Sequence, residues 1–338
     1  MPLTQANLRL WDLLLSHRVT TIIYIAAKLG LAEFLREGPR HLDELAELTK
    51  ADKGALARLL TALSTVGICS LGRDNLYSLT ELGAGLDGEA EESLKRLAIF
   101  EGQILTKSWA GMLETIMTGK TAAQLLGAGN SFDLMARDPE NVRMYNAAMA
   151  DVTRIVAPEI LRAYDFSCVS HLMDVGGGSG ELIGAVAKRH PHLRATIFDL
   201  ARCAESATDH LTKLGVSDRV TFVVGNFFQT IPSVADAIVM KSVIHVWNDE
   251  LSLSVLRNCH QALPKTGTLL LVERLMPDHF TDADAHKEQA LSDLNMLRGP
   301  GGQERTEQEY VRLLQKSGFV HRATYPAGRF SVIEANIK

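Results

Sequence analysis

A run of glycines follows one apolar segment and could hold a ligand against bare backbone. The apolar run HLMDV (171–175) leads directly into GGGSG (176–180), and the amphipathic segment ELIGAVAKRH (181–190) follows. A strand, a glycine turn and a helix in this order are typical of nucleotide-like ligands, because glycine permits both the sharp turn and a close approach. A dinucleotide fingerprint would need a third glycine where Glu181 stands. The loop therefore favours another ligand.

Acidic and aromatic side chains accompany the loop. Asp174 and Glu181 flank it, and two carboxylates would repel a pyrophosphate but suit a cofactor that carries an ammonium and a sulfonium. Asp199 ends the next strand and is placed to accept hydrogen bonds from ribose hydroxyls. Asn226 and Phe227 follow the third strand and offer an amide and a ring to an adenine. Each residue alone is equally typical of a strand-end turn, but their order on consecutive strands favours a shared site.

The elements that position these residues alternate between strand and helix from His171 onward. Buried parallel strands joined by helical crossovers produce short apolar runs at regular intervals, and ligands then bind at the carboxyl ends of the strands. We therefore predict a doubly wound α/β sheet. The predicted strands are HLMDV, ATIFDL, VTFVVG, AIVMKS and TLLLVERL.

Residues 1–100 have a different pattern. Apolar residues recur at helical spacing, and two helices, the second at 53–67, precede a hairpin at 68–80. This is the winged-helix order, which is most often found in DNA-binding proteins. The second helix carries only Lys53 and Arg58 as basic residues, too few for phosphates and base edges. A dimerisation module is therefore favoured over a DNA-binding one.

Residues 101–160 are predicted to form helices that join the two parts. Five apolar residues recur there at helical spacing, and such a stripe is more often core than ligand pocket. We expect the stripe to be buried. Its members are Trp109, Met112, Leu113, Ile116 and Met117.

Composition narrows the class of protein. The 338 residues suggest two domains, and 46% hydrophobic with 22% charged residues is typical of a globular chain. A net charge of −5 disfavours nucleic acid as a partner. We find neither a signal peptide nor an apolar run of membrane-spanning length, and the four cysteines are scattered. These features predict a cytoplasmic protein with reduced thiols and no membrane partner.

The motifs together resemble a known family, the dimeric class I S-adenosylmethionine (SAM)-dependent O-methyltransferases, which include plant caffeate-type and bacterial phenazine enzymes. The resemblance covers nearly the whole chain. It implies a Rossmann-like catalytic domain at 161–338, a winged-helix dimerisation domain at 1–100, and a linker at 101–160 that contributes to the acceptor pocket. It rests on DVGGGSG, FDL, GNFF, KSVIHVWND, LLLVERLMPD and LNMLRGPGGQERT.

The resemblance also implies roles for single residues. His245 matches the family's catalytic base, and Glu273 and Glu304 match the two acids around it. SAM, with S-adenosylhomocysteine (SAH) as its product, is implied to contact Asp174, Gly176, Gly178, Asp199, Leu200, Asn226, Phe227, Lys241 and Ser242. A small hydroxylated aromatic acceptor is implied to lie against Trp109, Met149, Trp247, Met296 and Phe330.

Two positions depart from the family pattern. Val246 stands where an aspartate usually follows the catalytic histidine, so a role for that acid is not expected here. Asn226 stands where many members have aspartate, which removes a charge but keeps hydrogen-bonding capacity.

The expected chemistry is methyl transfer to a hydroxyl. A phenol is mostly protonated at pH 7, so the neutral imidazole of His245 can remove its proton while Glu273 or Glu304 fixes the tautomer. Glu304 also precedes a capping box formed by Thr306 and Glu309, and both roles can coexist. The alternatives are N- or C-methylation on the same scaffold, and a winged-helix regulator that retains a cofactor fold.

One loop invites a metal interpretation. DHFTDADAHK (278–287) gathers three aspartates and two histidines, which would suit metal-dependent catechol methylation. The spacing matches neither a tetrahedral zinc site nor an EF-hand, so a solvated acidic loop is the favoured interpretation. We predict that no metal is required.

Overall fold

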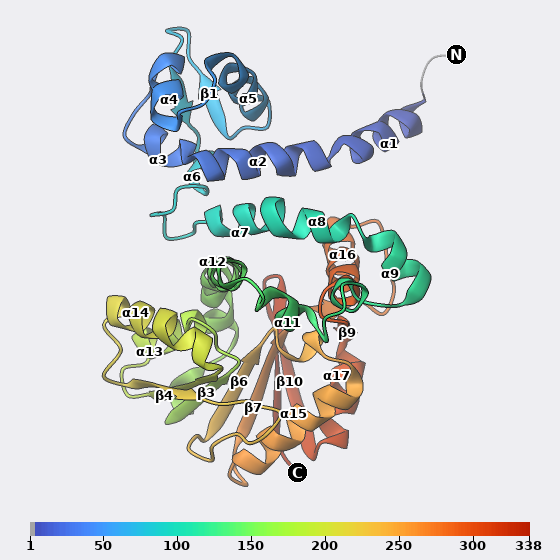
Figure 1. The fold of residues 1–338 in the computed structure, drawn as a ribbon. Helices are drawn as coiled ribbons and strands as arrows, with labels where there is room; N and C mark the ends of the chain where they lie inside the picture. The colour runs from blue at the N-terminus through green and yellow to red at the C-terminus, as the bar shows by residue number, and fades with distance from the viewer. Residues whose placement is uncertain (1–3) are drawn as a thin grey trace. The chain divides into compact units, whose positions relative to one another are not determined.

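The computed structural model describes residues 4–338, which separate into two compact units (Figure 1). The first contains residues 4–109 and 143–152, and the second contains residues 110–142 and 153–338. Across residues 4–338, every helix is too short or too polar to cross a lipid bilayer.

The first unit is mainly helical, and a hairpin follows its fifth helix. Apolar residues recur every three or four positions along α5 and bury Leu56, Leu60 and Leu63, while Asp52 caps the helix by accepting from Ala55 N at 2.8 Å. The predicted helix, helix and hairpin order is therefore present. The elements are α1 (Gln5–Leu15), α2 (His17–Leu29), α3 (Leu31–Arg36), α4 (Leu42–Thr49), α5 (Lys53–Thr65), β1 (Cys69–Leu71), β2 (Tyr77–Leu79), α6 (Glu81–Ala84), α7 (Lys95–Phe100), a π-helix (Glu101–Leu105) and α8 (Thr106–Trp109).

Along the chain, three short helices and one long helix lie between α8 and the strands of the large sheet. They are α9 (Met112–Thr118), α10 (Ala122–Leu125), α11 (Ser131–Met135) and the 25-residue α12 (Pro139–Ala163). The prediction that the apolar stripe is core was wrong for α9. Leu113, Ile116 and Met117 are 74%, 56% and 76% exposed in the single chain, because α9 is a two-turn surface helix whose buried residue is Thr115.

A seven-stranded sheet forms the centre of the second unit, in the order β10-β11-β7-β6-β3-β4-β5. The five predicted strands are present and pair in parallel, whereas β10 and β11 form an antiparallel hairpin that pairs with β7. The strand order reverses between β3 and β6, which is where ligands bind in such sheets. The strands are β3 (His171–Val175), β4 (Arg194–Asp199), β5 (Val220–Val224), β6 (Ala237–Lys241), β7 (Thr268–Glu273), β10 (Phe319–Ala327) and β11 (Phe330–Ile337).

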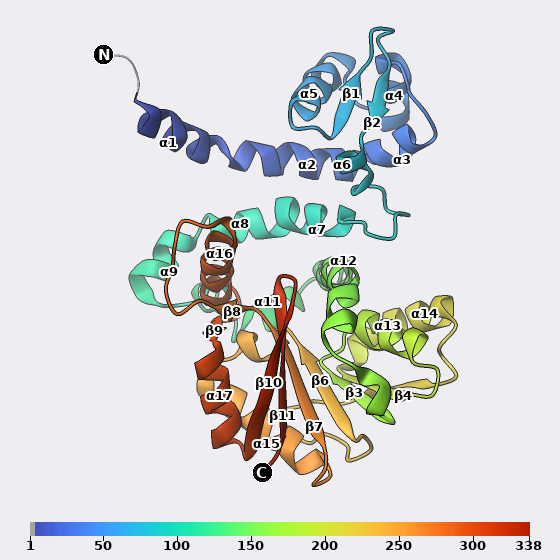
Figure 2. The same cartoon turned by 180° about the vertical axis from the view of Figure 1, so that it is seen from behind.

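Helices cover both faces of this sheet (Figures 1 and 2). On one face α13 (Glu181–Arg189), α14 (Ala204–Leu214) and the last turns of α12 pack against Val239 and Leu270. On the other face α15 (Asp249–Ala262) and α17 (Glu307–Lys316) pack against Met240 and Leu271. Alternate residues of β6 and β7 thus enter opposite cores, as period two requires for a strand buried on both sides.

The predicted capping box is present, because Thr306 accepts from Glu309 N and Glu309 accepts from Thr306 N at the start of α17.

The remaining elements lie around the carboxyl ends of the strands and in the connections. These elements are the 3₁₀ turns Phe166–Cys168, Ala201–Cys203 and Ile244–Val246, the short strands β8 (Leu275–Met276) and β9 (Arg305–Thr306), and α16 (Asp284–Arg298).

Candidate active site

The glycine loop after β3 requires glycine at several positions. Gly176, Gly178 and Gly180 have φ angles of 77°, 56° and 79°, a region that side chains with a Cβ rarely adopt. A Cβ on Gly180 would lie 2.6 Å from Ile197 Cδ1, and one on Gly176 would lie 2.8 Å from a methyl of Val243. Gly178 differs because its added Cβ would meet no protein atom within 4 Å. Gly176 and Gly180 are thus needed for packing, and Gly178 presents open backbone.

The end of β4 meets the same loop. Asp199 Oδ2 accepts from Gly178 N at 2.8 Å, and its Oδ1 accepts from Leu200 N at 2.6 Å. Burial raises the pKa of Asp199, although these two backbone hydrogen bonds oppose the rise. Each oxygen keeps a further lone pair, so the carboxylate can still accept hydrogen bonds from a diol.

A second carboxyl group lies behind the loop at the end of β3. Asp174 is 2% exposed. Burial, with a smaller contribution from Asp199, raises its pKa to about 7. Lys241, at the end of β6, acts in the opposite direction on Asp174, and burial lowers the pKa of this lysine to about 8. The site therefore holds a carboxyl group that is poised to ionise beside a cationic ligand.

Glu181 does not serve the loop as we expected. Its carboxylate pairs with Arg154 Nη2 at 2.7 Å and lies 3.3 Å from His210 Nε2. It is 8% exposed and occupies the first turn of α13. The interpretation of Glu181 as an acid facing a sulfonium cofactor was wrong, because α12 and α14 supply its partners.

The end of β5 leads into an aromatic cluster. Phe227 and Phe228 lie 6.2 and 4.9 Å from the ring of Trp247, measured between centroids, and Phe132 lies 6.0 Å from it. Trp247 Nε1 is buried without a hydrogen-bond partner. Asn226 is exposed and caps its own turn, since its Oδ1 accepts from Phe228 N at 2.9 Å. Trp247, expected against the acceptor, thus packs with Phe227, which was expected at the adenine.

His245 sits in a 3₁₀ turn after β6. The chain leaves that strand through Ser242, whose φ of 56° is left-handed, a strained conformation that clusters at functional sites. Glu273, at the end of the neighbouring strand β7, stabilises the turn, because its Oε1 accepts from Val243 N at 3.1 Å and from Ile244 N at 2.8 Å. One predicted acid therefore acts on the backbone of the turn.

The other predicted acid, Glu304, binds the imidazole of His245. Nδ1 of His245 donates to Glu304, 3.1 and 3.2 Å from its two oxygens, and the unbonded Oε2 of Glu273 lies 3.7 Å away. Burial lowers the pKa of His245, but these two carboxylates outweigh burial and the net pKa is raised. Occupation of Nδ1 directs the remaining ring nitrogen, Nε2, to chemistry.

Glu304 is itself fixed by neighbours from α16. Ser292 Oγ donates to Glu304 Oε1 at 2.7 Å and accepts from Arg274 Nη1 at 3.0 Å, while Asp293 Oδ1 accepts from Glu304 N at 2.9 Å. Burial raises the pKa of Glu304, but the hydrogen bonds from His245 and Ser292 lower it below its usual value overall. An ionised Glu304 is therefore favoured beside the imidazole.

The five residues predicted to line the acceptor pocket are distributed over both units. Trp109 and Met149 belong to the first unit. Met296, on α16, is half-buried. Phe330 is 4% exposed and contacts two cations, with Lys241 Nζ 5.1 Å and Arg274 Cζ 4.9 Å from its ring centroid. Phe330 therefore supports charged side chains at the ends of β6 and β7.

The loop considered for a metal makes internal contacts. Within residues 4–338, the structure contains no cluster of three or more side chains suited to holding a metal ion. Nδ1 of His286 accepts a hydrogen bond from Thr281 N at 2.9 Å, so this nitrogen closes the loop. Val246, which follows the histidine, is buried at 8% exposure.

Sequence reasoning missed the residues that support the site. Ser292, Asp293 and Arg274 hold Glu304, and Phe132 joins the aromatic cluster. Ser292 and Asp293 lie outside the motifs, and Arg274, although it lies within LLLVERLMPD, has no spacing that indicates its partner. The contacts arise only when α16 and α11 are placed beside the sheet.

Comparisons with known proteins place this geometry in context. Residues 109–320 match the model of the O-methyltransferase domain, and residues 11–86 match the O-methyltransferase dimerisation domain. The phenazine O-methyltransferase PhzM of Lysobacter antibioticus is 33% identical over 327 residues, covering 96% of this chain and 95% of that protein.

Solved structures agree with the family models. The crystal structure of LaPhzM has a TM-score of 0.93 and 33% identity, and the match covers 99% of this chain and all of that one. The O-methyltransferase NcsB1 from neocarzinostatin biosynthesis, solved with SAM and 2-hydroxy-5-methyl naphthoic acid, has a TM-score of 0.77 and 27% identity over 95% of this chain and 96% of its own. This supports SAM as the cofactor.

Proposed function

We propose that this chain, which belongs to the O-methyltransferase family, methylates a hydroxyl of a small aromatic secondary metabolite and uses His245 as the general base. Family membership makes it a SAM-dependent O-methyltransferase of the secondary-metabolite type. The aromatic class of acceptor and the role of each residue are our proposals.

One observation carries the proposal. His245 is buried at the carboxyl end of β6 with Nδ1 bonded to an ionised Glu304 at 3.1 Å. This arrangement fixes the tautomer in which Nε2 is the lone-pair nitrogen, and it raises the basicity of the ring. Gly176, across the switch point of the sheet, comes so close that an added Cβ would touch Val243. The base and the glycine loop therefore belong to one site.

The residues present fit a sulfonium nucleoside. Gly178 offers open backbone, Asp199 can accept from ribose hydroxyls, and Phe227 offers an aromatic ring. Nε1 of Trp247, whose ring centroid lies 6.2 Å from that of Phe227, is buried without a hydrogen-bond partner. Asp174 would pair with the ammonium group once ionised. When bound, SAM supplies an electrophilic methyl group on a positively charged sulfur.

The chain's own residues then have two tasks. Positioning of the acceptor oxygen in line with the methyl group can supply roughly 7–11 kcal/mol. Nε2 of His245 takes the hydroxyl proton as the oxygen attacks, and the resulting imidazolium is stabilised by Glu304 at 3.1 Å and by Glu273 at 3.7 Å. No metal enters these steps.

Paired acceptors test the proposal. We would incubate the full-length protein with methyl-labelled SAM and with hydroxy, amino and methoxy derivatives of naphthalene, phenazine and benzoate. Label should enter only the hydroxy compounds, as methyl ethers identified by mass spectrometry, with no loss of rate in EDTA. Labelled amines or carbon-methylated products would contradict O-methylation. Shifted genomic fragments in a gel, without methyl transfer, would favour the regulator.

A further inference from the structure

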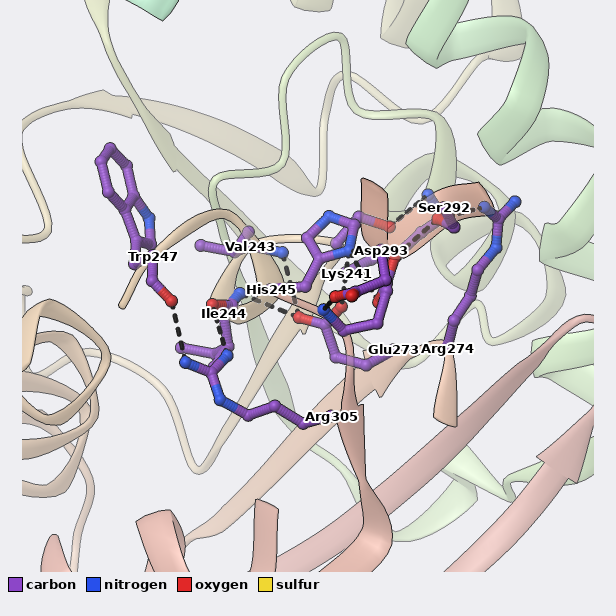
Figure 3. Close-up of polar contacts among 12 residues, drawn as sticks. Lys241, Val243, Ile244, His245, Trp247, Glu273, Arg274, Ser292, Asp293 and Arg305 are labelled. Carbon is purple, nitrogen blue, oxygen red and sulfur yellow. Dashed lines mark hydrogen bonds and ion pairs between the residues drawn. The ribbon is translucent and has the colours of Figure 1, made fainter. Parts of the chain in front are cut away.

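The turn that carries His245 is held at its backbone as well as at its ring. Arg305 is 0% exposed, and its guanidinium donates to the carbonyls on either side of the histidine, from Nη1 to Ile244 O at 3.2 Å and from Nη2 to Trp247 O at 2.9 Å (Figure 3). Between them, Gln303 N donates to His245 O at 2.9 Å. Three carbonyls of this short turn are thus bound by the segment that also carries Glu304.

Burial of the Arg305 guanidinium costs free energy, because a charged group loses its hydration. Its Nε and Nη2 both donate to Asp249 Oδ1, at 3.1 and 2.8 Å, and its Cζ lies 6.0 Å from the centroid of the Tyr310 ring. The Asp249 side chain, which pairs with this buried cation, is 63% exposed. Such a group is tolerated because all three nitrogens are hydrogen-bonded.

We propose that Arg305 is a positioning residue that holds His245 against Glu304. The inference rests on the proposed function only in treating His245 as the base. Gly302 supports it, because a Cβ at this residue would lie 2.1 Å from His245 O and would separate the two segments. Without the guanidinium, Ile244 O and Trp247 O lose their bonds to the segment that carries Glu304 and keep only local donors, among them Ser252 Oγ at 3.4 and 3.3 Å. The turn can then move, and the contact between Nδ1 and Glu304 lengthens.

Geometry and charge can be separated at this position. A guanidinium presents its donors in a fixed fork, whereas a lysine ammonium is a single point that cannot reach Ile244 O, Trp247 O and Asp249 together. Arg305→Lys therefore keeps the charge and loses the fork. Arg305→Met loses both.

The test measures the pKa of His245 by NMR in the full-length protein with labelled histidine, with the signal assigned from His245→Asn. In both Arg305 variants this pKa should fall toward its usual value of about 6.5, because the imidazole moves away from two carboxylates. SAH affinity, measured by calorimetry, should change little. With an aromatic alcohol that the wild type methylates, kcat should fall about 10–100-fold while the KM for SAM stays unchanged.

Arg219→Met is the matched control. Arg219 also donates to two backbone carbonyls, Ala187 O at 2.9 Å and His190 O at 3.4 Å, but it lies at the amino end of β5. This control should leave the His245 pKa unchanged. If Arg305→Met does not fold, Arg305→Lys decides. Wild-type behaviour of Arg305→Lys, or an equal shift in Arg219→Met, would overturn the proposal. The pKa of His245 is measured without turnover, so this test can succeed or fail independently of whether the protein methylates a hydroxyl.

Discussion

Two carboxylates act on one imidazole at His245, and they do so in different ways. Glu304 contacts the ring at 3.1 Å, whereas Glu273 binds the turn beneath it through Val243 N and Ile244 N. Both raise the pKa of His245 against the effect of burial. Since the neutral imidazole is the base, activity should increase with pH through a pKa above the usual value of about 6.5.

Glu304→Gln should move that dependence to lower pH. The substitution removes one charge that stabilises the imidazolium, so the pKa of His245 falls and the acid limb of kcat/KM shifts downward. The plateau rate should also fall, by about tenfold or more, because the ring becomes less basic. The measurement is kcat/KM between pH 5.5 and 9. Glu307→Gln, on the same segment, should retain the wild-type profile, and a limb that stays in place in Glu304→Gln would refute the assignment.

Asp174 predicts a proton linked to cofactor binding. Its pKa of about 7 means that it is mostly protonated at pH 6 and mostly ionised at pH 8.5. Pairing with the ammonium of SAH requires the ionised form, so binding should release a proton at pH 6 and none at pH 8.5. Calorimetry in buffers of different ionisation enthalpy measures this release. It should vanish in Asp174→Asn, and a release that survives the substitution would assign the proton elsewhere.

The sequence predicted which residues surround the base more accurately than it predicted the partners of individual side chains. His245, Glu273 and Glu304 lie together as the motifs indicated. Glu181 was misassigned, because the pattern shows an acid after a glycine loop but not the Arg154 and His210 that occupy it. A side chain's partners on other elements have no signature in local spacing.

At the scale of elements, the loop between β3 and α13 combines backbone strain with an open face. Gly178→Ala tests whether a ligand approaches this open backbone, and Gly215→Ala is its control because Gly215 has a similar left-handed conformation. The φ angles are 56° and 71°, and a Cβ would meet no protein atom within 4 Å at either residue. Both alanine variants should lose about 1 kcal/mol of stability, which denaturant unfolding measures. Only Gly178→Ala should lose SAH affinity, by about tenfold or more, because its Cβ occupies ligand space.

Gly215 is the C-cap of α14, in the left-handed region, and it was not predicted to contact the cofactor. Equal SAH affinity in the two variants would mean that the ligand does not approach Gly178. A large loss in Gly215→Ala would mean that strain, and not the added methyl group, is being measured.

Prediction of helices and strands succeeded where the run of apolar residues allows only one kind of element. The predicted strand HLMDV coincides with β3, because a run buried on both faces is continuous and ends at glycine. It failed at α9, where the same helical periodicity lies on an exposed face. Periodicity defines a face of a helix, but it does not specify which surface will cover that face.

At the scale of the whole molecule, α1 leaves an apolar face uncovered in the single chain. Leu10, Trp11 and Leu14 are 57%, 61% and 66% exposed, in a helix with no buried residue. Large exposed apolar patches mark interaction sites. The matched dimerisation domain supports a homodimer, and we propose that α1 contributes to its interface.

The double variant Leu10→Glu, Leu14→Glu should shift the full-length protein from dimer to monomer in light scattering after size exclusion, because buried charges without partners oppose association. Val234→Glu, at a 50% exposed site in the second unit, is the control and should remain dimeric. A double variant that keeps the dimer mass would remove α1 from the interface.

The central claim is that His245 removes the acceptor proton. The most direct measurement compares wild type and His245→Ala on a series of substituted phenols of decreasing pKa, with labelled SAM at a single pH. The account predicts a deficit of about 10²–10⁴-fold for weakly acidic phenols that shrinks as the phenol becomes ionised before it binds. A deficit that is independent of phenol pKa, or the absence of any deficit, would contradict it.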